Sequence, residues 1–201
     1  MKVKEIFASI QGEGKHIGKP TTFVRLSGCN LRCRWCDTRY AWTGGKEISV
    51  DEIVEHIRRM NLPNVCITGG EPMLQEKELE KLVGKLKRGG YHITLETNGT
   101  LYNKKIFDKV DCASVDMKPP SSGEKSDERI LKKLKEKDQV KVIIANDRDL
   151  RFAKRITGKS KVETILQPAA GANIKRIANK VIRQKINARL LPQLHKIIKL
   201  K

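Results

Sequence analysis

The sequence predicts an α/β fold made of βα units, arranged as an incomplete (βα)6-type barrel. Short apolar or β-branched runs alternate with longer helical patterns roughly every 20 to 25 residues, which favours a parallel sheet. About six such units are too few to close an eight-stranded barrel. The chain has 201 residues, of which 38% are hydrophobic, and this is enough for one domain with its own core.

Strands are expected at short runs of apolar and β-branched residues bounded by polar or glycine-containing segments. These runs are 3–6, 22–27, 65–68, 91–95, 112–115, 140–144 and 162–166. Several of them end in polar motifs, such as Gly69-Gly70 and Glu96-Thr97-Asn98-Gly99. In barrels of this kind functional side chains gather at the carboxyl ends of the strands, so these motifs mark the expected site.

Helices are expected where apolar residues recur at intervals of three and four. The segment 50–60 shows this spacing, and Ser49 stands before it as an N-cap. The other expected helices are 76–87, 127–137, 147–156 and a long amphipathic helix at 173–190.

The net charge of +19 is spread unevenly along the chain. Glu163 is the last acidic residue, and the segment 164–201 holds nine Lys or Arg side chains. Such a segment attracts phosphate polymers or anionic small molecules, or it forms a solvated Lys-rich face. Aromatic residues make up only 4% of the chain, which argues against nucleic-acid binding as the main function, because such proteins usually stack bases on aromatic rings.

No apolar run approaches the ~18 residues of a membrane span, and the N-terminal segment lacks the apolar stretch of a secretory signal. We therefore expect a cytoplasmic protein without a membrane partner. Apolar periodic segments recur along the whole chain, which excludes a disordered protein.

The chain has five cysteines, and an odd number argues against a disulfide framework. Cys29, Cys33 and Cys36 form a C-x3-C-x2-C cluster in a loop after an expected strand, where three thiolates suit a soft metal centre. Zinc is the rival metal, but a closed structural zinc site takes four ligands. A [4Fe–4S] cluster on three thiolates would leave one iron open. Cys66 and Cys112 lie in apolar runs and are expected in the core.

The cysteine spacing, with Trp35 directly before the third cysteine, resembles the signature of the radical S-adenosylmethionine (SAM) superfamily. The resemblance implies that the three cysteines ligate three irons of a [4Fe–4S] cluster and that SAM chelates the fourth. Reduction of the cluster then cleaves SAM and forms a 5′-deoxyadenosyl radical. The segment 68–72, Thr-Gly-Gly-Glu-Pro, looks like the glycine-rich SAM-binding motif of the superfamily, and Gly70 is the expected contact with the SAM amino group.

The same resemblance implies a partial TIM barrel formed by one domain over residues 1–201. Within it, the cluster loop spans 28–46, and a C-terminal helix and tail span 173–201.

Further stretches narrow the resemblance to the 7-carboxy-7-deazaguanine synthase family, and together they cover nearly the whole chain. They are 9–14, Arg25, Cys36-Asp37-Thr38, 96–99, Gln167-Pro168 and 193–196. The resemblance implies a radical ring contraction of 6-carboxy-5,6,7,8-tetrahydropterin to 7-carboxy-7-deazaguanine, with loss of ammonia and regeneration of SAM. It also implies Mg2+, a reducing electron donor of the flavodoxin or ferredoxin type, and a homodimer. The product feeds the deazaguanine bases of tRNA, queuosine or archaeosine.

The residues implied as substrate contacts are Ile10, Gln11, Gly12, Glu13, Arg25, Thr68, Glu96, His195 and Lys201. Arg25 offers a bidentate fork for the substrate carboxylate and is implied as catalytic together with the three cysteines; its alternative is a surface ion pair. Glu96 would accept from the guanidine-like edge of the substrate or cap the next helix. His195 would line the pocket or shuttle a proton, or simply pack at the C-terminus. The contact at Lys201 would come from the terminal carboxylate.

The residues implied as SAM contacts are Trp35, Cys36, Asp37, Gly70, Asp116, Met117, Lys118, Gln167, Pro168, Ala169 and Ala170. Asp116 would accept a hydrogen bond from a ribose hydroxyl, or it would cap the end of its strand. Thr38 is implied as the Mg2+ ligand, which agrees with the preference of Mg2+ for oxygen donors. The sequence alone predicts no more than a loop hydroxyl at that position.

Two other functions remain open at this point. One is an activase that makes a glycyl radical on a partner protein, although Gln11-Gly12-Glu13-Gly14 and Arg25 fit a small carboxylated substrate better. The other is a basic RNA-binding protein in which the metal loop is structural.

Overall fold

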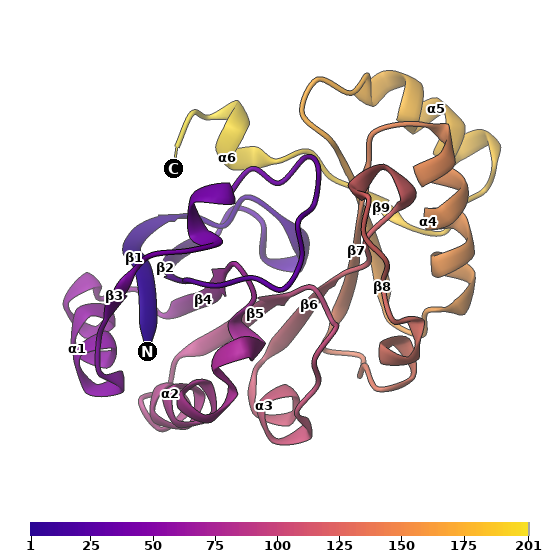
Figure 1. Ribbon diagram of the computed structural model, residues 1–201. Helices are drawn as coiled ribbons and strands as arrows, with labels where there is room; N and C mark the ends of the chain where they lie inside the picture. Colours follow the sequence, from indigo (N-terminus) through magenta and orange to yellow (C-terminus); the bar gives the residue numbers. More distant parts are fainter. Residues whose placement is uncertain (201) are drawn as a thin grey trace.

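The computed structural model describes residues 1–200, in which nine strands form one sheet in the order β3-β1-β2-β4-β5-β6-β7-β8-β9 (Figure 1). The strands are β1 (Lys2–Ile10), β2 (Pro20–Leu26), β3 (Lys46–Glu47), β4 (Asn64–Gly69), β5 (His92–Thr97), β6 (Cys112–Asp116), β7 (Gln139–Ile144), β8 (Glu163–Pro168) and β9 (Arg189–Leu190). All pairs from β2 to β9 are parallel, whereas β1 is antiparallel to both β2 and β3. The sheet curves without closing, so the fold is α/β and is consistent with the expected partial barrel.

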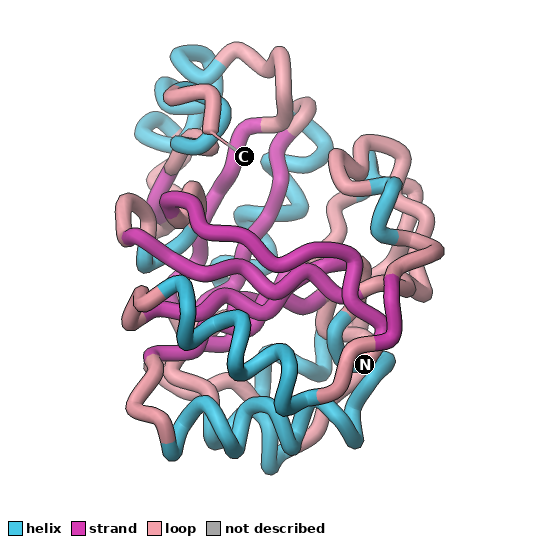
Figure 2. Tube along the Cα trace, turned by 90° about the vertical axis from the view of Figure 1, so that its left-hand side faces the viewer, coloured by secondary structure: helices cyan, strands magenta, loops and turns pink. Residues whose placement is uncertain are grey.

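The helices are α1 (Val50–Met60), α2 (Glu76–Arg88), α3 (Lys104–Lys109), α4 (Asp147–Lys159), α5 (Ile174–Arg183) and α6 (Leu194–Ile197). Helices α1 to α5 lie along the outer face of this sheet, whereas the short α6 lies beside the pocket on the inner face (Figure 1 and Figure 2). The helix residues Ile57, Leu82 and Ile156 are fully buried between helices and sheet. Burial of such apolar side chains on one face leaves the opposite face of the sheet for polar groups.

Local sequence explains where the first helix begins and ends. The Ser49 hydroxyl accepts from the Glu52 backbone N–H, and the Glu52 carboxylate accepts from the Ser49 N–H, so the predicted N-cap is part of a capping box. Asn61 ends the helix in a left-handed conformation with φ of 52°.

The expected α-helix at 127–137 is wrong. The structure has a 3-10 helix at Glu128–Lys132 instead, opened by Asp127, whose carboxylate accepts from the Arg129 N–H. The chain then bends because the Asp138 side chain accepts from both the Lys135 and Ala113 N–H groups. These bonds tie the end of the segment to β6, and the segment therefore does not continue as an α-helix.

The long helix expected at 173–190 is also wrong, because α5 ends at Arg183. Lys185 takes a left-handed conformation with φ of 51°, and the chain then turns back toward the sheet. Arg189 and Leu190 pair with Ile165 and Leu166 as strand β9. The short helices α3 and α6 and the edge strand β3 were not predicted.

Within residues 1–200, none of the helices combines the length and the apolar character needed to cross a membrane. Cys66 and Cys112 are fully buried, as expected, although Cys66 also borders the pocket described next.

Candidate active site

A pocket lies on the inner face of the sheet, where the parallel strands end. It brings together most residues that the sequence predicted for a site: Ile10, Gln11, Gly12, Glu13, Arg25, Cys29, Cys33, Trp35, Cys36, Asp37, Thr38, Thr68, Gly70, Glu96, Asp116, Lys118, Gln167, Pro168, Ala169, Ala170 and His195. Met117 does not line the pocket, because its side chain is 1% exposed and packs in the core. Lys201 lies outside the described residues.

The three clustered cysteines sit on the loop after β2. Their thiols are free, and all three border the pocket. The loop is pinned by two backbone hydrogen bonds, from Arg34 N to Ser122 O at 2.9 Å and from Cys36 N to Cys33 O at 3.2 Å. Burial raises the pKa of the Cys29 and Cys33 thiols, while the nearby Lys118 ammonium acts in the opposite direction on both.

The chemistry of this donor set fits an iron–sulfur cluster, because three free thiols on one loop open into a single pocket. Within residues 1–200, no group of three or more His, Cys, Asp or Glu side chains is placed to hold a single metal ion. The pocket beside the thiols continues to the glycine-rich loop after β4, so a ligand bound there can contact both.

Two glycines allow the ends of β2 and β4 to meet closely. Gly69 has φ of 140°, and a Cβ there would lie 2.1 Å from the Leu26 carbonyl oxygen. A Cβ on Gly70 would lie 2.0 Å from the Gly28 carbonyl oxygen, next to the first cysteine of the cluster. Only glycine fits at either position, so the predicted glycine-rich motif places backbone against backbone at the wall of the pocket.

Glu71 anchors this glycine-rich loop and was missed from sequence as a site-building residue. Its buried carboxylate accepts from the Met73 N–H at 2.9 Å, the Asn98 N–H at 2.7 Å and the Thr97 hydroxyl at 2.8 Å. Burial raises its pKa, although these donors favour the ionised form. The glycine-rich loop is thereby fixed to the end of β5.

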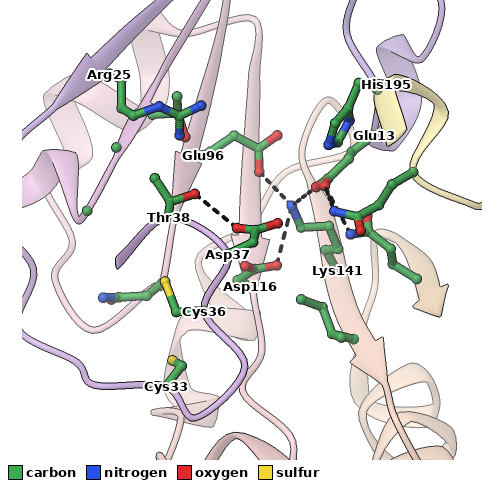
Figure 3. Close-up of a pocket in the computed structure, with 18 of the residues that line it drawn as sticks. Glu13, Arg25, Cys33, Cys36, Asp37, Thr38, Glu96, Asp116, Lys141 and His195 are labelled. Atoms are coloured by element: carbon green, nitrogen blue, oxygen red, sulfur yellow. Dashed lines mark hydrogen bonds and ion pairs between the residues drawn. The ribbon is translucent and has the colours of Figure 1, made fainter. Parts of the chain in front are cut away.

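Lys141, in the middle of β7, is the largest omission from the predicted site. Its Nζ lies 2.5 Å from Glu13 Oε2, 3.1 Å from Glu96 Oε2 and 3.6 Å from Asp116 Oδ1 (Figure 3). Lys118 forms a second ion pair with Asp116, at 2.9 Å. Burial disfavours the Lys141 ammonium, but the three carboxylates outweigh it and hold its pKa well above the usual value.

Arg25 and Glu5 form an ion pair between β2 and β1, with 2.8 Å from Nε to Oε1. Both side chains are largely buried, and the Tyr40 hydroxyl donates to the same Glu5 oxygen at 2.7 Å. The Arg25 guanidinium also lies near the Phe7 ring, 5.6 Å from its centroid. Arg25 therefore forms the ion pair that was the alternative to a substrate contact, and it also borders the pocket.

Thr38 and Asp37 place two oxygen donors side by side at the pocket, since the Thr38 hydroxyl donates to Asp37 Oδ1 at 2.9 Å. Burial raises the Asp37 pKa, but the Lys196 ammonium at 3.0 Å outweighs it and keeps the pKa below the usual value. Hydroxyl and carboxylate oxygens are the donor types that Mg2+ prefers.

The C-terminal segment packs on the loop after β1 and forms another wall of the pocket. Leu194 N donates to Gly12 O at 2.9 Å, and the His195 ring occupies the space where a Gly12 Cβ would stand. Gln193 donates from Nε2 to Glu13 Oε1 at 2.6 Å. Burial lowers the pKa of His195, which favours its neutral form.

The radical SAM superfamily model matches residues 23–173 of the chain. A 7-carboxy-7-deazaguanine synthase of Methanospirillum hungatei is 40% identical over 200 residues, which cover 98% of this chain and 85% of that protein. A protein of the same name from Thermoplasma acidophilum is 40% identical over 205 residues, covering 98% and 97%. Among solved structures, the crystal structure of QueE from Escherichia coli has a TM-score of 0.78 at 25% identity and covers 96% of this chain and 94% of that one.

The matched region contains the three-cysteine loop and the glycine-rich loop, and the two relatives cover nearly the whole chain. The superfamily implies a [4Fe–4S] cluster and SAM, and the three free thiols of the pocket fit the cluster. The chain therefore belongs to the radical SAM superfamily and, within it, to the family of 7-carboxy-7-deazaguanine synthases.

Proposed function

We propose that this radical SAM enzyme converts 6-carboxy-5,6,7,8-tetrahydropterin to 7-carboxy-7-deazaguanine with loss of ammonia, as a carbon–nitrogen lyase. The observation that carries the proposal is one pocket that joins the three-thiol loop to a set of carboxylates and an arginine. The name shared by the 40% identical relatives supports the same reaction.

Cys29, Cys33 and Cys36 would hold the [4Fe–4S] cluster, and Thr38 would hold Mg2+. SAM would contact the glycine-rich loop at Gly70 and the segments 116–118 and 167–170; at Met117 this contact falls to the backbone, since the side chain is in the core. Trp35 and Asp37 would complete that part of the site. When bound, the reduced cluster and SAM supply the carbon radical that starts the chemistry.

The chain's own side chains would bind and orient the pterin. Arg25 and the Mg2+ would share the substrate carboxylate, and Glu96 would accept from its guanidine-like edge. Ile10, Gln11 and Gly12 would offer backbone and amide groups to the ring, and Thr68, which lines the same pocket, would add a further contact.

We further propose that the chain acts in the cytoplasm as one domain over residues 1–201 and as a homodimer. A reduced flavodoxin or ferredoxin would supply electrons, and the product would feed the deazaguanine bases of tRNA.

A single anaerobic experiment tests the reaction. We expect the reconstituted and reduced protein to give an iron–sulfur signal by electron paramagnetic resonance, and to form a deazapurine product only with SAM, reductant and Mg2+. Cys33→Ala should abolish both the signal and turnover, because one thiolate ligand is lost. Stoichiometric consumption of SAM without a deazapurine product would contradict the proposed reaction, and one zinc per chain without an iron–sulfur signal would contradict radical chemistry altogether.

A further inference from the structure

Lys141 is a buried cation at the point where three carboxylates from three different elements converge. Glu13 comes from the loop after β1, Glu96 from β5 and Asp116 from β6, while Lys141 itself is only 5% exposed. A lysine in the middle of a strand costs free energy unless it is paired, so the arrangement calls for an explanation.

Glu13 has its hydrogen-bonding capacity largely used by the protein. Its Oε1 accepts from the side-chain amides of Gln167 at 3.0 Å and Gln193 at 2.6 Å, and its Oε2 accepts from Lys141. A carboxylate with these three donors has little room for a ligand. Glu13 is therefore better suited to hold Lys141 in place than to bind a substrate.

Glu96 is held differently, through a single oxygen. Its Oε2 accepts from Lys141 at 3.1 Å, and its Oε1 accepts no hydrogen bond from residues 1–200. The side chain borders the pocket, so the second oxygen is available to a ligand (Figure 3).

We propose that Lys141 is a positioning residue that sets substrate specificity. Held by Glu13, its ammonium fixes one oxygen of Glu96 and aims the other at an N–H donor of the ligand's amino-pyrimidinone edge. The inference deepens the proposed function and rests on it. Burial raises the pKa of Glu96, so the adjacent ammonium is the group that favours its ionised, acceptor form.

The test compares the dissociation constants of two pterins for the reconstituted protein. One is 6-carboxytetrahydropterin, and the other is the analogue with oxygen in place of the 2-amino group. We expect the wild type to prefer the first by at least about 100-fold, because the analogue presents a carbonyl oxygen to the Glu96 carboxylate where the amino group would donate. Lys141→Met should reduce that preference to less than about 10-fold, since the acceptor is then no longer oriented.

The matched control is Lys87→Met. Lys87 is a partly buried lysine on α2, outside the pocket, and it pairs with Asp111 at 2.7 Å. This substitution should leave the preference unchanged. Lys141→Arg keeps the charge and should retain most of the preference. A merely structural role for Lys141 would weaken both affinities by the same factor, so an unchanged ratio in Lys141→Met would overturn the inference.

Two further outcomes keep the test decisive. If Lys141→Met does not fold, Glu96→Gln should lose the preference while Lys141→Arg keeps it. The inference is overturned if Glu96→Gln keeps the preference or Lys141→Arg loses it. If the wild type binds neither pterin, the proposed function itself has failed, and the positioning role fails with it. If the wild type binds the pterins and Lys141→Met keeps the full preference for 6-carboxytetrahydropterin, only the positioning role is refuted.

Discussion

Gly69 shows how one residue decides whether two loops of the site can meet. Its φ of 140° is a conformation that side chains other than hydrogen disfavour, and a Cβ would collide with both the N and O atoms of Leu26. Because Leu26 leads directly into the cysteine loop, strain at this point would reach the thiols as well as the fold.

We expect Gly69→Ala to lower the free energy of unfolding by about 3 kcal/mol, from the strained φ and the backbone clash together. Gly158→Ala is the control, since Gly158 lies in α4 with nothing within 4 Å of its ideal Cβ. Its substitution should stabilise by roughly 0.5–1 kcal/mol through higher helix propensity. Denaturant unfolding of both variants checks this, and a Gly69→Ala variant as stable as the wild type would contradict the close approach.

At the residue scale the sequence predicted the thiols and glycines that line the pocket, but not the side chains that hold the pocket together. The C-x3-C-x2-C spacing and the Gly-Gly pair carry chemical information in a short stretch, and the structure brings them to one pocket. Lys141 pairs with residues 128 and 45 positions away in sequence, which no local pattern reveals. A signal was present, because a lysine between Val140 and Val142 in a buried strand must find a counter-charge.

The C-terminal elements link the cysteine loop to the loop after β1, and both loops line the pocket. Lys196 on α6 pairs with Asp37 on the cysteine loop at 3.0 Å, and the same segment is bonded to Gly12 and Glu13. Periodicity predicted one long helix across 173–190, because it cannot detect the left-handed Lys185 or the return to β8. Such chain reversals depend on tertiary contacts.

We expect Lys196→Gln to loosen α6 from the cysteine loop. The pair is partly exposed, so the loss of global stability should stay below about 1 kcal/mol. Hydrogen exchange of the α6 amides should nevertheless accelerate, and KM for the proposed pterin substrate should rise a few-fold, because one wall of the pocket becomes mobile.

Lys180→Gln is the control for Lys196→Gln. It removes an ion pair of 2.6 Å to Asp147 between α5 and α4, and it should change neither hydrogen exchange in α6 nor KM. Equal effects of the two substitutions would show that α6 is not held by the Asp37 contact.

At the scale of the whole molecule, strand and helix alternation was sufficient to predict the parallel sheet that runs from β2 to β8. It did not reveal that β1 turns back antiparallel to β2, since a hairpin and a crossover share the same strand pattern. The consequence is functional. The reversed strand delivers the loop with Gln11 and Glu13 to the inner face, where the open barrel would otherwise lack a wall.

The net charge of +19 also acts on the molecule as a whole. Some cations of the basic C-terminal segment are paired, as Arg176 and Lys180 are with Asp147 and Arg189 is with Glu163, but the excess remains on the surface. Like charges repel across the folded chain, and the unfolded chain relieves that repulsion by expanding.

We therefore expect the thermal midpoint to rise by several degrees when NaCl is increased from about 0.01 M to 0.15 M, because the Debye length then falls from ~30 to ~8 Å. Differential scanning calorimetry at fixed pH measures this. A double variant, Lys199→Glu with Lys185→Glu, lowers the net charge by four and should show a smaller rise. If the midpoint instead falls with salt in both proteins, attractive ion pairs outweigh the repulsion, and the surface excess does not destabilise the fold.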